Sequence, residues 1–173
     1  MSKSGFLPPE SEWGELATVY TYDDDENLVA VEKPNSDARD WTPGGSGLVA
    51  TAGDYLRFAL MLWNGGSYDG VRVLAEETVA LMTTPHVTEG VLVDMGIEGL
   101  GWGFGIAVVI DSDLTPQPDF DGDFWWSGYY GTSFFVSPES GLAGVVLTQH
   151  QPNTWGSFPY GVFIAQGIAI AGL

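Results

Sequence analysis

The chain of 173 residues contains no cysteine and only five lysines and arginines, and each scarcity excludes a class of function. Without cysteine there is no disulfide framework, no thiol nucleophile and no zinc site built on thiolates. The formal net charge of -18 leaves no basic patch of the kind that binds a phosphate backbone or an anionic membrane surface. We therefore expect neither nucleic acid nor a membrane as a partner.

The acidity has two interpretations that composition alone does not separate. An acidic, lysine-poor surface keeps a protein soluble, and the same surface is useful in a saline environment. The hydrophobic content of 45% is that of a folded chain with one ordinary core, not that of a disordered chain. We expect a single domain over residues 1–173.

Long apolar runs are also scarce. Residues 1–9 lack the apolar stretch of a signal peptide, which predicts a cytoplasmic protein if Met1 is the natural start. Residues 158–173 are apolar, but they are interrupted by proline and glycine and are shorter than the roughly 20 residues of a membrane span. A buried C-terminal helix is expected there.

Periodicity and turn signals outline the first elements. Weak alternation predicts strands at 16–22 and 28–31 around an acidic turn. Apolar side chains spaced three and four residues apart predict a helix that is capped by Thr51 and ends at Gly65-Gly66. A second, shorter helix is expected at 76–82, with acidic residues in its first turn.

Three apolar segments follow, and each predicts a strand: 102–110, 124–136 and 142–149. Separated by a polar loop and a tight turn, they predict an antiparallel meander closed by the C-terminal helix. The expected fold class is α+β, with a helical and loop region over 1–100 and an antiparallel sheet of about three main strands plus the terminal helix over 101–173.

Familiar pairs of nucleophile and base are not found in the chain. A serine activated by a lysine needs the spacing Ser-x-x-Lys, but the two lysines are Lys3 and Lys33, and Ala30 stands three residues before Lys33. His86 and His150 leave a Ser-His-Asp site formally open, although nothing in their spacing supports one. A histidine with an ordinary hydrogen bond is the favoured interpretation of both.

Asp119, Asp121 and Asp123 alternate along the chain, as calcium ligands sometimes do. A calcium loop of the EF-hand type needs glycine at its sixth position and glutamate at its twelfth, where this chain has Phe124 and Tyr130. Two histidines without cysteine also argue against zinc. The favoured interpretation is a solvated acidic loop with no metal, and no glycine pattern for a nucleotide cofactor is present.

The most informative stretch is Trp125-Trp126-Ser127-Gly128-Tyr129-Tyr130-Gly131. It reads as an aromatic-rich strand whose glycines predict the close approach of another backbone or a ligand. Because Trp125 and Trp126 are adjacent, their side chains should face opposite sides of the sheet, one in the core and the other toward a cleft. Seven tryptophans and seven tyrosines also leave a groove for a carbohydrate or aromatic ligand open.

This stretch resembles the third active-site motif of the serine β-lactamase and penicillin-binding-protein superfamily. In that motif a lysine, histidine or tryptophan is followed by any residue and then by glycine, and the tryptophan form is similar to that of class C β-lactamase-like carboxylesterases. Residues 44–58 resemble the glycine-rich loop and following helix of the same family. The resemblance covers nearly the whole chain, as the C-terminal part of a longer protein.

In that family a serine attacks an ester or β-lactam carbonyl, and a lysine and a tyrosine from two upstream motifs move the proton. The resemblance implies that Trp126, Ser127 and Gly128 form one wall of the substrate site and that the N–H of Tyr129 is an oxyanion-hole donor. Tryptophan in place of lysine removes the cation that would bind a β-lactam carboxylate, so an esterase-type parent is implied.

Neither Ser-x-x-Lys nor the upstream Tyr-x-Asn motif is found in the chain. The sequence therefore predicts a truncated β-lactamase-like hydrolase of the esterase type, with no catalytic residue of its own and inactive alone. Two alternatives remain: half of an ester- or β-lactam-hydrolysing enzyme completed by another chain, or a module that binds a small acyl or ester ligand in an aromatic groove. An open sheet edge would predict a homo-oligomer or a complementing N-terminal chain.

Overall fold

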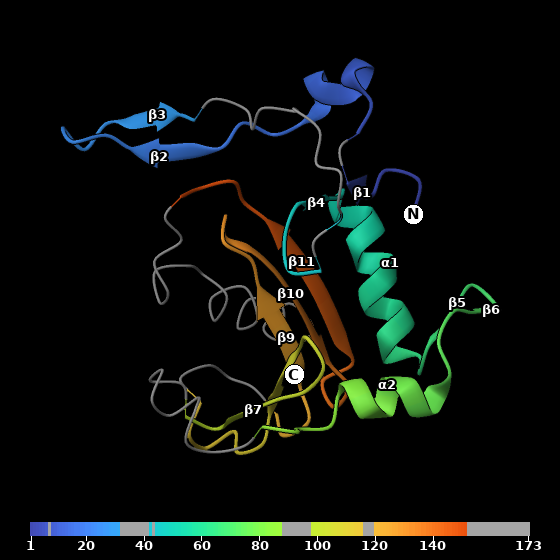
Figure 1. The fold of residues 1–173 in the computed structure, drawn as a ribbon. Helices are drawn as coiled ribbons and strands as arrows, with labels where there is room; N and C mark the ends of the chain where they lie inside the picture. The colour runs from blue at the N-terminus through green and yellow to red at the C-terminus, as the bar shows by residue number, and fades with distance from the viewer. Residues whose placement is uncertain (7, 32–41, 43, 88–97, 116–119, 152–173) are drawn as a thin grey trace.

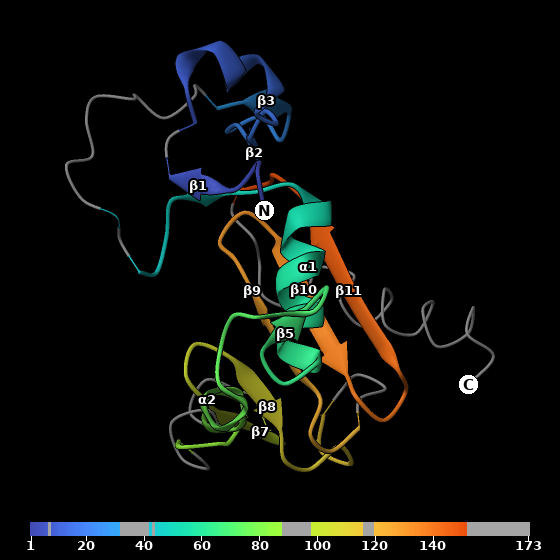
Figure 2. The same cartoon turned by 90° about the vertical axis from the view of Figure 1, so that its right-hand side faces the viewer.

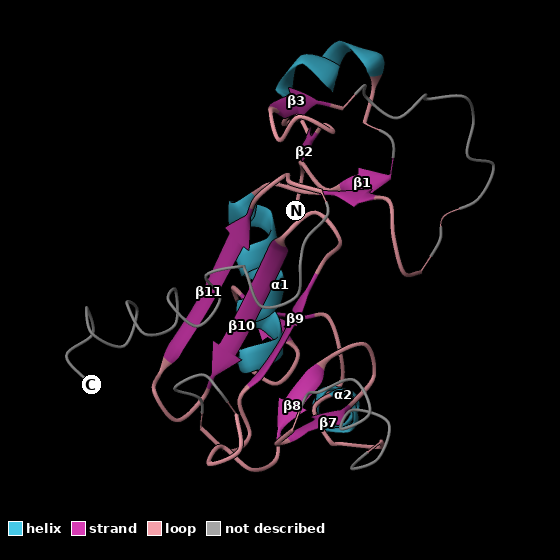
Figure 3. Cartoon of the chain, turned by 90° about the vertical axis from the view of Figure 1, so that its left-hand side faces the viewer, coloured by secondary structure: helices cyan, strands magenta, loops and turns pink. Residues whose placement is uncertain are grey.

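The centre of the structure is a five-stranded antiparallel sheet with the strand order β11-β10-β9-β8-β7 (Figure 3). The structure is a computed structural model, and it describes residues 1–6, 8–31, 42, 44–87, 98–115 and 120–151. The five strands are Leu100–Trp102 (β7), Ala107–Val109 (β8), Phe124–Ser127 (β9), Thr132–Ser137 (β10) and Leu142–Leu147 (β11). Strands that follow one another along the chain are neighbours in the sheet, which confirms the predicted meander.

The predicted number of three strands was wrong, because two of the expected strands each fold into a hairpin. The segment 102–110 turns between β7 and β8 near Gly105, whose φ is 75°. The segment 124–136 turns between β9 and β10 at Gly131, whose φ is 80°. Glycine adopts this left-handed backbone without the steric cost of a Cβ atom, so these glycines permit turns inside segments that read as continuous. The third predicted strand is confirmed as β11.

Helix α1 (Ala52–Trp63) packs across one face of the sheet, against β10 and β11 (Figure 2). Thr51 caps it as predicted, since its Oγ1 accepts the N–H of Asp54 at 3.2 Å. Gly65 and Gly66 follow the helix with φ of 60° and 96°, which confirms the predicted glycine end. Helix α2 (Glu76–Met82) has the predicted limits and lies near the β7–β8 end of the sheet.

Two hydrophobic clusters hold the sheet, and they share half-buried Trp126. The cluster beneath α1 centres on Leu62, which is 2% exposed, and on Phe134 of β10. Complete burial of one leucine side chain contributes about 1.5–3 kcal/mol, so the burial of Leu62 helps to hold α1 on the sheet. The other cluster consists of Leu100, Ala107, Val109, Trp125 and Phe135, with Trp102, Trp126 and Leu142 packed against it.

Short paired strands surround this core. Gly5–Phe6 (β1) pairs with Leu48–Val49 (β4), and Ser67–Tyr68 (β5) pairs with Val71–Arg72 (β6). A 3-10 helix, η1, spans Glu10–Glu15. The predicted acidic hairpin is confirmed as Tyr20–Tyr22 (β2) and Leu28–Ala30 (β3), and it lies beyond one end of the central sheet (Figure 1).

The expected C-terminal helix at 158–173 and residue Asp119 lie outside the described residues. Within the described part of the chain, neither helix has the length and apolar character needed to cross a membrane.

Candidate functional site

The stretch from Trp125 to Gly131 is the end of a strand and a tight turn. In the register of β9 and β10, Ser127 stands opposite Ser133. The N–H of Gly128 donates to the carbonyl of Thr132 at 2.7 Å, and the N–H of Gly131 donates to the carbonyl of Gly128 at 3.0 Å. A Cβ atom on Gly128 would collide with the Thr132 hydroxyl. The close approach predicted for these glycines is therefore present, but the approaching group is the next strand of the same chain.

Strand β9 is covered on only half of its length by β8. The β8 pairing reaches Phe124 and Trp125, whereas β10 pairs with all four residues of β9. In the described part of the chain, no strand pairs with Ser127 on the β8 side. In the same part of the chain, no main-chain hydrogen bond engages the N–H of Tyr129. An uncovered strand edge followed by a main-chain donor has the form of a site for a carbonyl oxygen.

The two adjacent tryptophans have different environments. Trp125 is 7% exposed and belongs to the second cluster with Phe135, which confirms that one of the pair is a core residue. Trp126 is half-buried, and its ring stacks on that of Trp125 with centroids 6.0 Å apart and planes at 27°, so the prediction that the two side chains face opposite sides of the sheet was wrong. That Trp126 faces a substrate stays a prediction.

Ser127 makes a cross-strand hydrogen bond instead of pairing with a base. Its hydroxyl lies 2.7 Å from the hydroxyl of Ser133, which is only 7% exposed. Lys3 is occupied elsewhere, because its Nζ lies 3.4 Å from Glu12 and 3.1 Å from Glu15. Among the described residues, the structure thus brings no lysine to Ser127.

The sequence did not reveal that hydrogen bonds from the segment after β11 hold the turn that follows Gly128. Tyr130 accepts the main-chain N–H of His150 at 3.0 Å, and the hydroxyl of Tyr129 accepts Nε2 of Gln151 at 3.0 Å. The same segment pairs with β2, since Tyr20 donates to the carbonyl of Gln149 at 2.9 Å and accepts from the N–H of Gln151 at 2.8 Å. The turn after Gly128 is therefore tied to a hairpin more than 100 residues away in sequence. No local pattern signals such a contact.

Among the described residues, the two histidines contact aromatic rings and a main-chain carbonyl. His86 is exposed, stacks on Phe104 at 4.3 Å and lies with Nε2 2.8 Å from the carbonyl oxygen of Leu81, which confirms an ordinary hydrogen bond. His150 meets Tyr22 edge-on at 5.3 Å, and its buried Nε2 has no hydrogen-bond partner among the described residues, so the hydrogen bond predicted for this ring is not found there. In that part of the chain no hydrogen bond or ion pair joins the His150 ring to a serine or a carboxylate.

The acidic loop before β9 was predicted to be solvated, and this prediction was wrong for Asp123, which is buried. Asp121 is exposed and accepts the N–H of Ser112 at 2.8 Å. Asp123 is 4% exposed; Oδ2 accepts the N–H of Phe120 at 3.1 Å, and Oδ1 has no partner among the described residues. Burial raises the pKa of Asp123 above its usual value. No group of three metal-ligating side chains is present in the described ranges.

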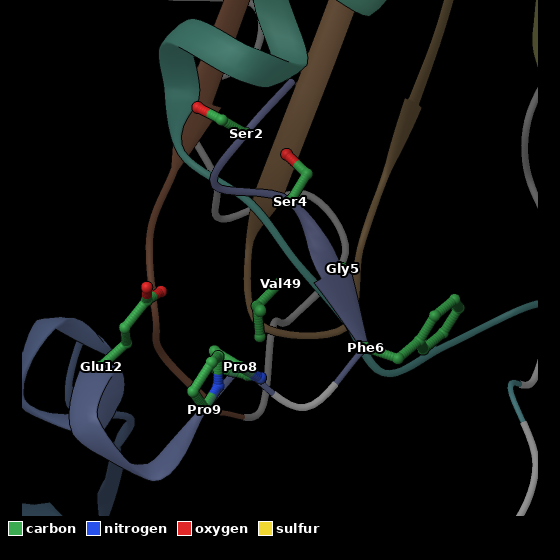
Figure 4. Close-up of a pocket in the computed structure, with 8 residues that line it drawn as sticks. All are labelled: Ser2, Ser4, Gly5, Phe6, Pro8, Pro9, Glu12 and Val49. Atoms are coloured by element: carbon green, nitrogen blue, oxygen red, sulfur yellow. The ribbon is translucent and has the colours of Figure 1, made fainter.

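A cavity of about 200 Å³ lies between β1, β4 and η1 (Figure 4). Ser2, Ser4 and Glu12 bring polar atoms to its wall, and the rest of the lining is Gly5, Phe6, Pro8, Pro9 and Val49. None of these residues belongs to the segment from Trp126 to Tyr129. The cavity is therefore a separate feature from the β9 edge, and its polar groups include no paired nucleophile and base.

An antiparallel sheet with a helix across one face, and a Trp-x-Gly segment at an uncovered strand edge, define a protein of the serine β-lactamase and penicillin-binding-protein class. The family profile described as Beta-lactamase matches residues 1–165. The chain belongs to this family, which confirms the resemblance seen in the sequence.

Individual relatives are about twice as long. An uncharacterised protein of Mycobacterium tuberculosis is 34% identical over 164 residues, a match covering 88% of this chain and 41% of the relative. The hydrolase EstCE1, described as having promiscuous acyltransferase activity, is 28% identical with a TM-score of 0.72, covering 98% of this chain and 46% of its own. Simvastatin synthase (LovD) from Aspergillus terreus, at 16% identity and a TM-score of 0.67 over 87% of this chain and 41% of its own, shares the fold. The chain thus spans less than half the length of these relatives.

Proposed function

We propose that this chain forms the C-terminal half of an ester-hydrolysing site. It supplies the wall made by Trp126, Ser127 and Gly128 and the oxyanion donor of Tyr129, while the serine nucleophile and its base come from an N-terminal half. The observation that carries the proposal concerns Ser127 and Tyr129: among the described residues no strand pairs with Ser127 on the β8 side, and no main-chain acceptor engages the N–H of Tyr129. A donor fixed at such a place contributes about 3 kcal/mol to stabilising a developing oxyanion.

Several observations support the view that this half is inactive alone. The chain holds neither Ser-x-x-Lys nor Tyr-x-Asn, and it spans 46% of EstCE1. The hydroxyl of Ser127 is engaged with Ser133, and Lys3 is engaged with glutamates. Because the nucleophile and base act as a unit, a wall and one oxyanion donor leave only residual rate enhancement.

An ester is favoured over a β-lactam as the substrate. A β-lactam carries a carboxylate that needs a cation, and Trp126 stands at the position where related enzymes have lysine. Among the described basic residues, Arg57 is paired with Asp54, and Arg72 donates to the carbonyls of Gly65 and Leu74. EstCE1 is described as a hydrolase with acyltransferase activity, and both activities transfer an acyl group, which supports an ester substrate.

The outer edge of β11 is the place where we propose that the N-terminal half docks. In the described part of the chain no strand pairs with that edge. The six residues Leu142–Leu147 include no charge and no proline, the features that usually protect an edge strand. We propose that a second copy of the chain occupies the edge when the N-terminal half is absent.

A pair of chromogenic substrates tests the proposal. The purified chain is incubated with p-nitrophenyl butyrate and with nitrocefin, alone and with a polypeptide encoded by the reading frame upstream of Met1. We expect ester turnover only in the mixture, with nitrocefin a poor substrate. Turnover by the chain alone that is lost on substitution of one of its own serines would overturn the assignment.

A binding module is the second candidate, and one contact favours it. The rings of Trp102 and Trp126 lie edge to face with centroids 4.2 Å apart, which presents aromatic surface beside the open edge of β9. Binding of N-(4-nitrophenyl)butanamide, a slowly hydrolysed analogue of the ester, without ester turnover in the completed mixture would select this function instead.

A further inference from the structure

We infer that Trp102 is a positioning residue that holds Trp126 in the site wall and thereby sets which acyl groups the site accepts. The inference rests on the proposed function for its substrate class, an ester with an apolar acyl group. It adds a residue from β7, two strands away from the Trp126-Ser127-Gly128 motif, to the determinants of that site.

The contact crosses an intervening strand. In the sheet register Trp102 stands opposite Ala107 of β8, and Ala107 stands opposite Trp125 of β9. The Trp102 ring meets the next residue of β9, Trp126, with ring planes at 82° and centroids 4.2 Å apart, and Trp126 also stacks on Trp125 at 6.0 Å. Edge-to-face geometry of this kind is favoured by the aromatic quadrupoles.

The main chain of Trp102 is held firmly from the other side. Its N–H donates to the carbonyl of Val87 at 2.7 Å, and its carbonyl accepts the N–H groups of His86 at 2.8 Å and Val87 at 3.1 Å. Gly103 follows, so close to the carbonyl of Met82 that a Cβ atom would collide with it. The segment after α2 therefore fixes the main chain of Trp102, and the rings of Trp102 and Trp125 both contact that of Trp126.

The two indoles lie beside the half of β9 that does not pair with β8. Both side chains are half-buried, so each keeps surface that a ligand can cover. An acyl chain or aryl group that enters from the β9 edge would lie against Trp126 and lose apolar surface to it. If the Trp126 side chain were free to rotate, the apolar surface would not be preorganised. Binding would then cost the conformational entropy of ordering that side chain.

Circular dichroism of the chain alone tests the positioning step. Two indoles in contact give an exciton couplet in the far-ultraviolet spectrum. Because Trp126 also stacks on Trp125 at 6.0 Å, we expect Trp126→Phe to remove most of the couplet and Trp102→Ala to reduce it clearly, while thermal unfolding confirms that the variants fold. Phe104→Ala is the matched control, because Phe104 is a 57% exposed aromatic in the same turn that stacks on His86 instead. A couplet unchanged by Trp102→Ala would refute the contact whether or not the esterase proposal holds.

Binding tests the specificity step. Quenching of tryptophan fluorescence by N-(4-nitrophenyl)butanamide is measured for the chain and its variants. An aromatic pair contributes about 0.5–1.5 kcal/mol, so Trp102→Ala should weaken binding by about two- to tenfold. Trp102→Phe should restore it to within about twofold, since a phenyl ring can still meet Trp126 edge-on. Equal affinity in the alanine variant and the parent chain would overturn the role of Trp102.

Discussion

The carboxylate of Asp54 accepts the main-chain N–H of Lys3 at 2.8 Å, although 51 residues separate the two. The same oxygen accepts the hydroxyl of Ser4 at 3.1 Å, and the other oxygen pairs with Arg57. Asp54 is 2% exposed and lies in the first turn of α1, where the helix dipole also favours a negative charge. One carboxylate therefore joins the start of the chain to the helix that covers the sheet.

Asp54→Asn should lower the thermal unfolding midpoint at pH 7 by several degrees. The N–H of Lys3 is the main cause that lowers the pKa of Asp54, so the charged form is stabilised in the folded protein. That stabilisation is complete above the ordinary carboxyl pKa of about 3.9 and is lost as the pH falls through the lowered folded pKa. The difference between parent and variant should therefore shrink below about pH 4. Asp24→Asn, in an exposed turn, is the matched control.

Gly128→Ala should destabilise the chain by about 1–3 kcal/mol, the usual cost of overpacking. The new Cβ would meet the Thr132 hydroxyl, so Thr132→Ala in the same chain should recover most of the loss. Gly14→Ala is the control, because a Cβ there meets nothing within 4 Å. Urea unfolding of the four variants measures the coupling, and additive effects of the two substitutions would contradict the contact.

Ser127→Ala should cost about 1 kcal/mol of stability, because it leaves the buried Ser133 hydroxyl without its cross-strand partner. The double variant Ser127→Ala with Ser133→Ala should cost less than the sum of the two single changes. Chemical denaturation gives both numbers. A loss of ester turnover beyond the effect on stability would instead make Ser127 part of the catalytic machinery.

Asp123→Asn should stabilise the chain at neutral pH. Burial raises the pKa of Asp123, so the folded protein favours the protonated form, and stability falls as the pH rises from the ordinary carboxyl range through the raised pKa. The amide has no such charge to bury. Each 1 kcal/mol gained would raise the unfolding midpoint by about 2–4 °C in a chain of this size. At pH 3, where both side chains are neutral, the two midpoints should converge.

The edge of β11, with which no strand of the described residues pairs, should make the isolated chain self-associate at micromolar concentration, and light scattering measures it. Because each copy carries a net charge of -18, added salt should strengthen the association. Val146→Lys places a charge on the edge strand and should favour the monomer. Val71→Lys, at a 62% exposed position outside the central sheet, should leave association unchanged. A monomer for the unsubstituted chain would contradict the expected oligomer.

Local features were predictable wherever one short segment carries its own signal. Thr51 and the glycines at 65 and 66 mark the ends of α1, and the acidic turn between β2 and β3 is held by Asp23, which accepts the N–H of Asn27 at 2.8 Å. The hairpins at Gly105 and Gly131 were not predicted, because apolar residues flank both turns. A run of apolar residues gives no local signal of where the chain reverses direction.

The sequence by itself determined the family and the absence of Ser-x-x-Lys from the chain, and it predicts that Trp126-Ser127-Gly128 form one wall of a site. Those conclusions depend on residue types at short spacing, which a linear chain displays directly. Three contacts come from the tertiary structure alone. The Thr132 hydroxyl packs against Gly128, the hydroxyls of Ser127 and Ser133 are hydrogen-bonded, and the rings of Trp102 and Trp126 are in contact. These contacts arise when the meander folds, because the sheet register, and not local spacing, selects the partner of each side chain.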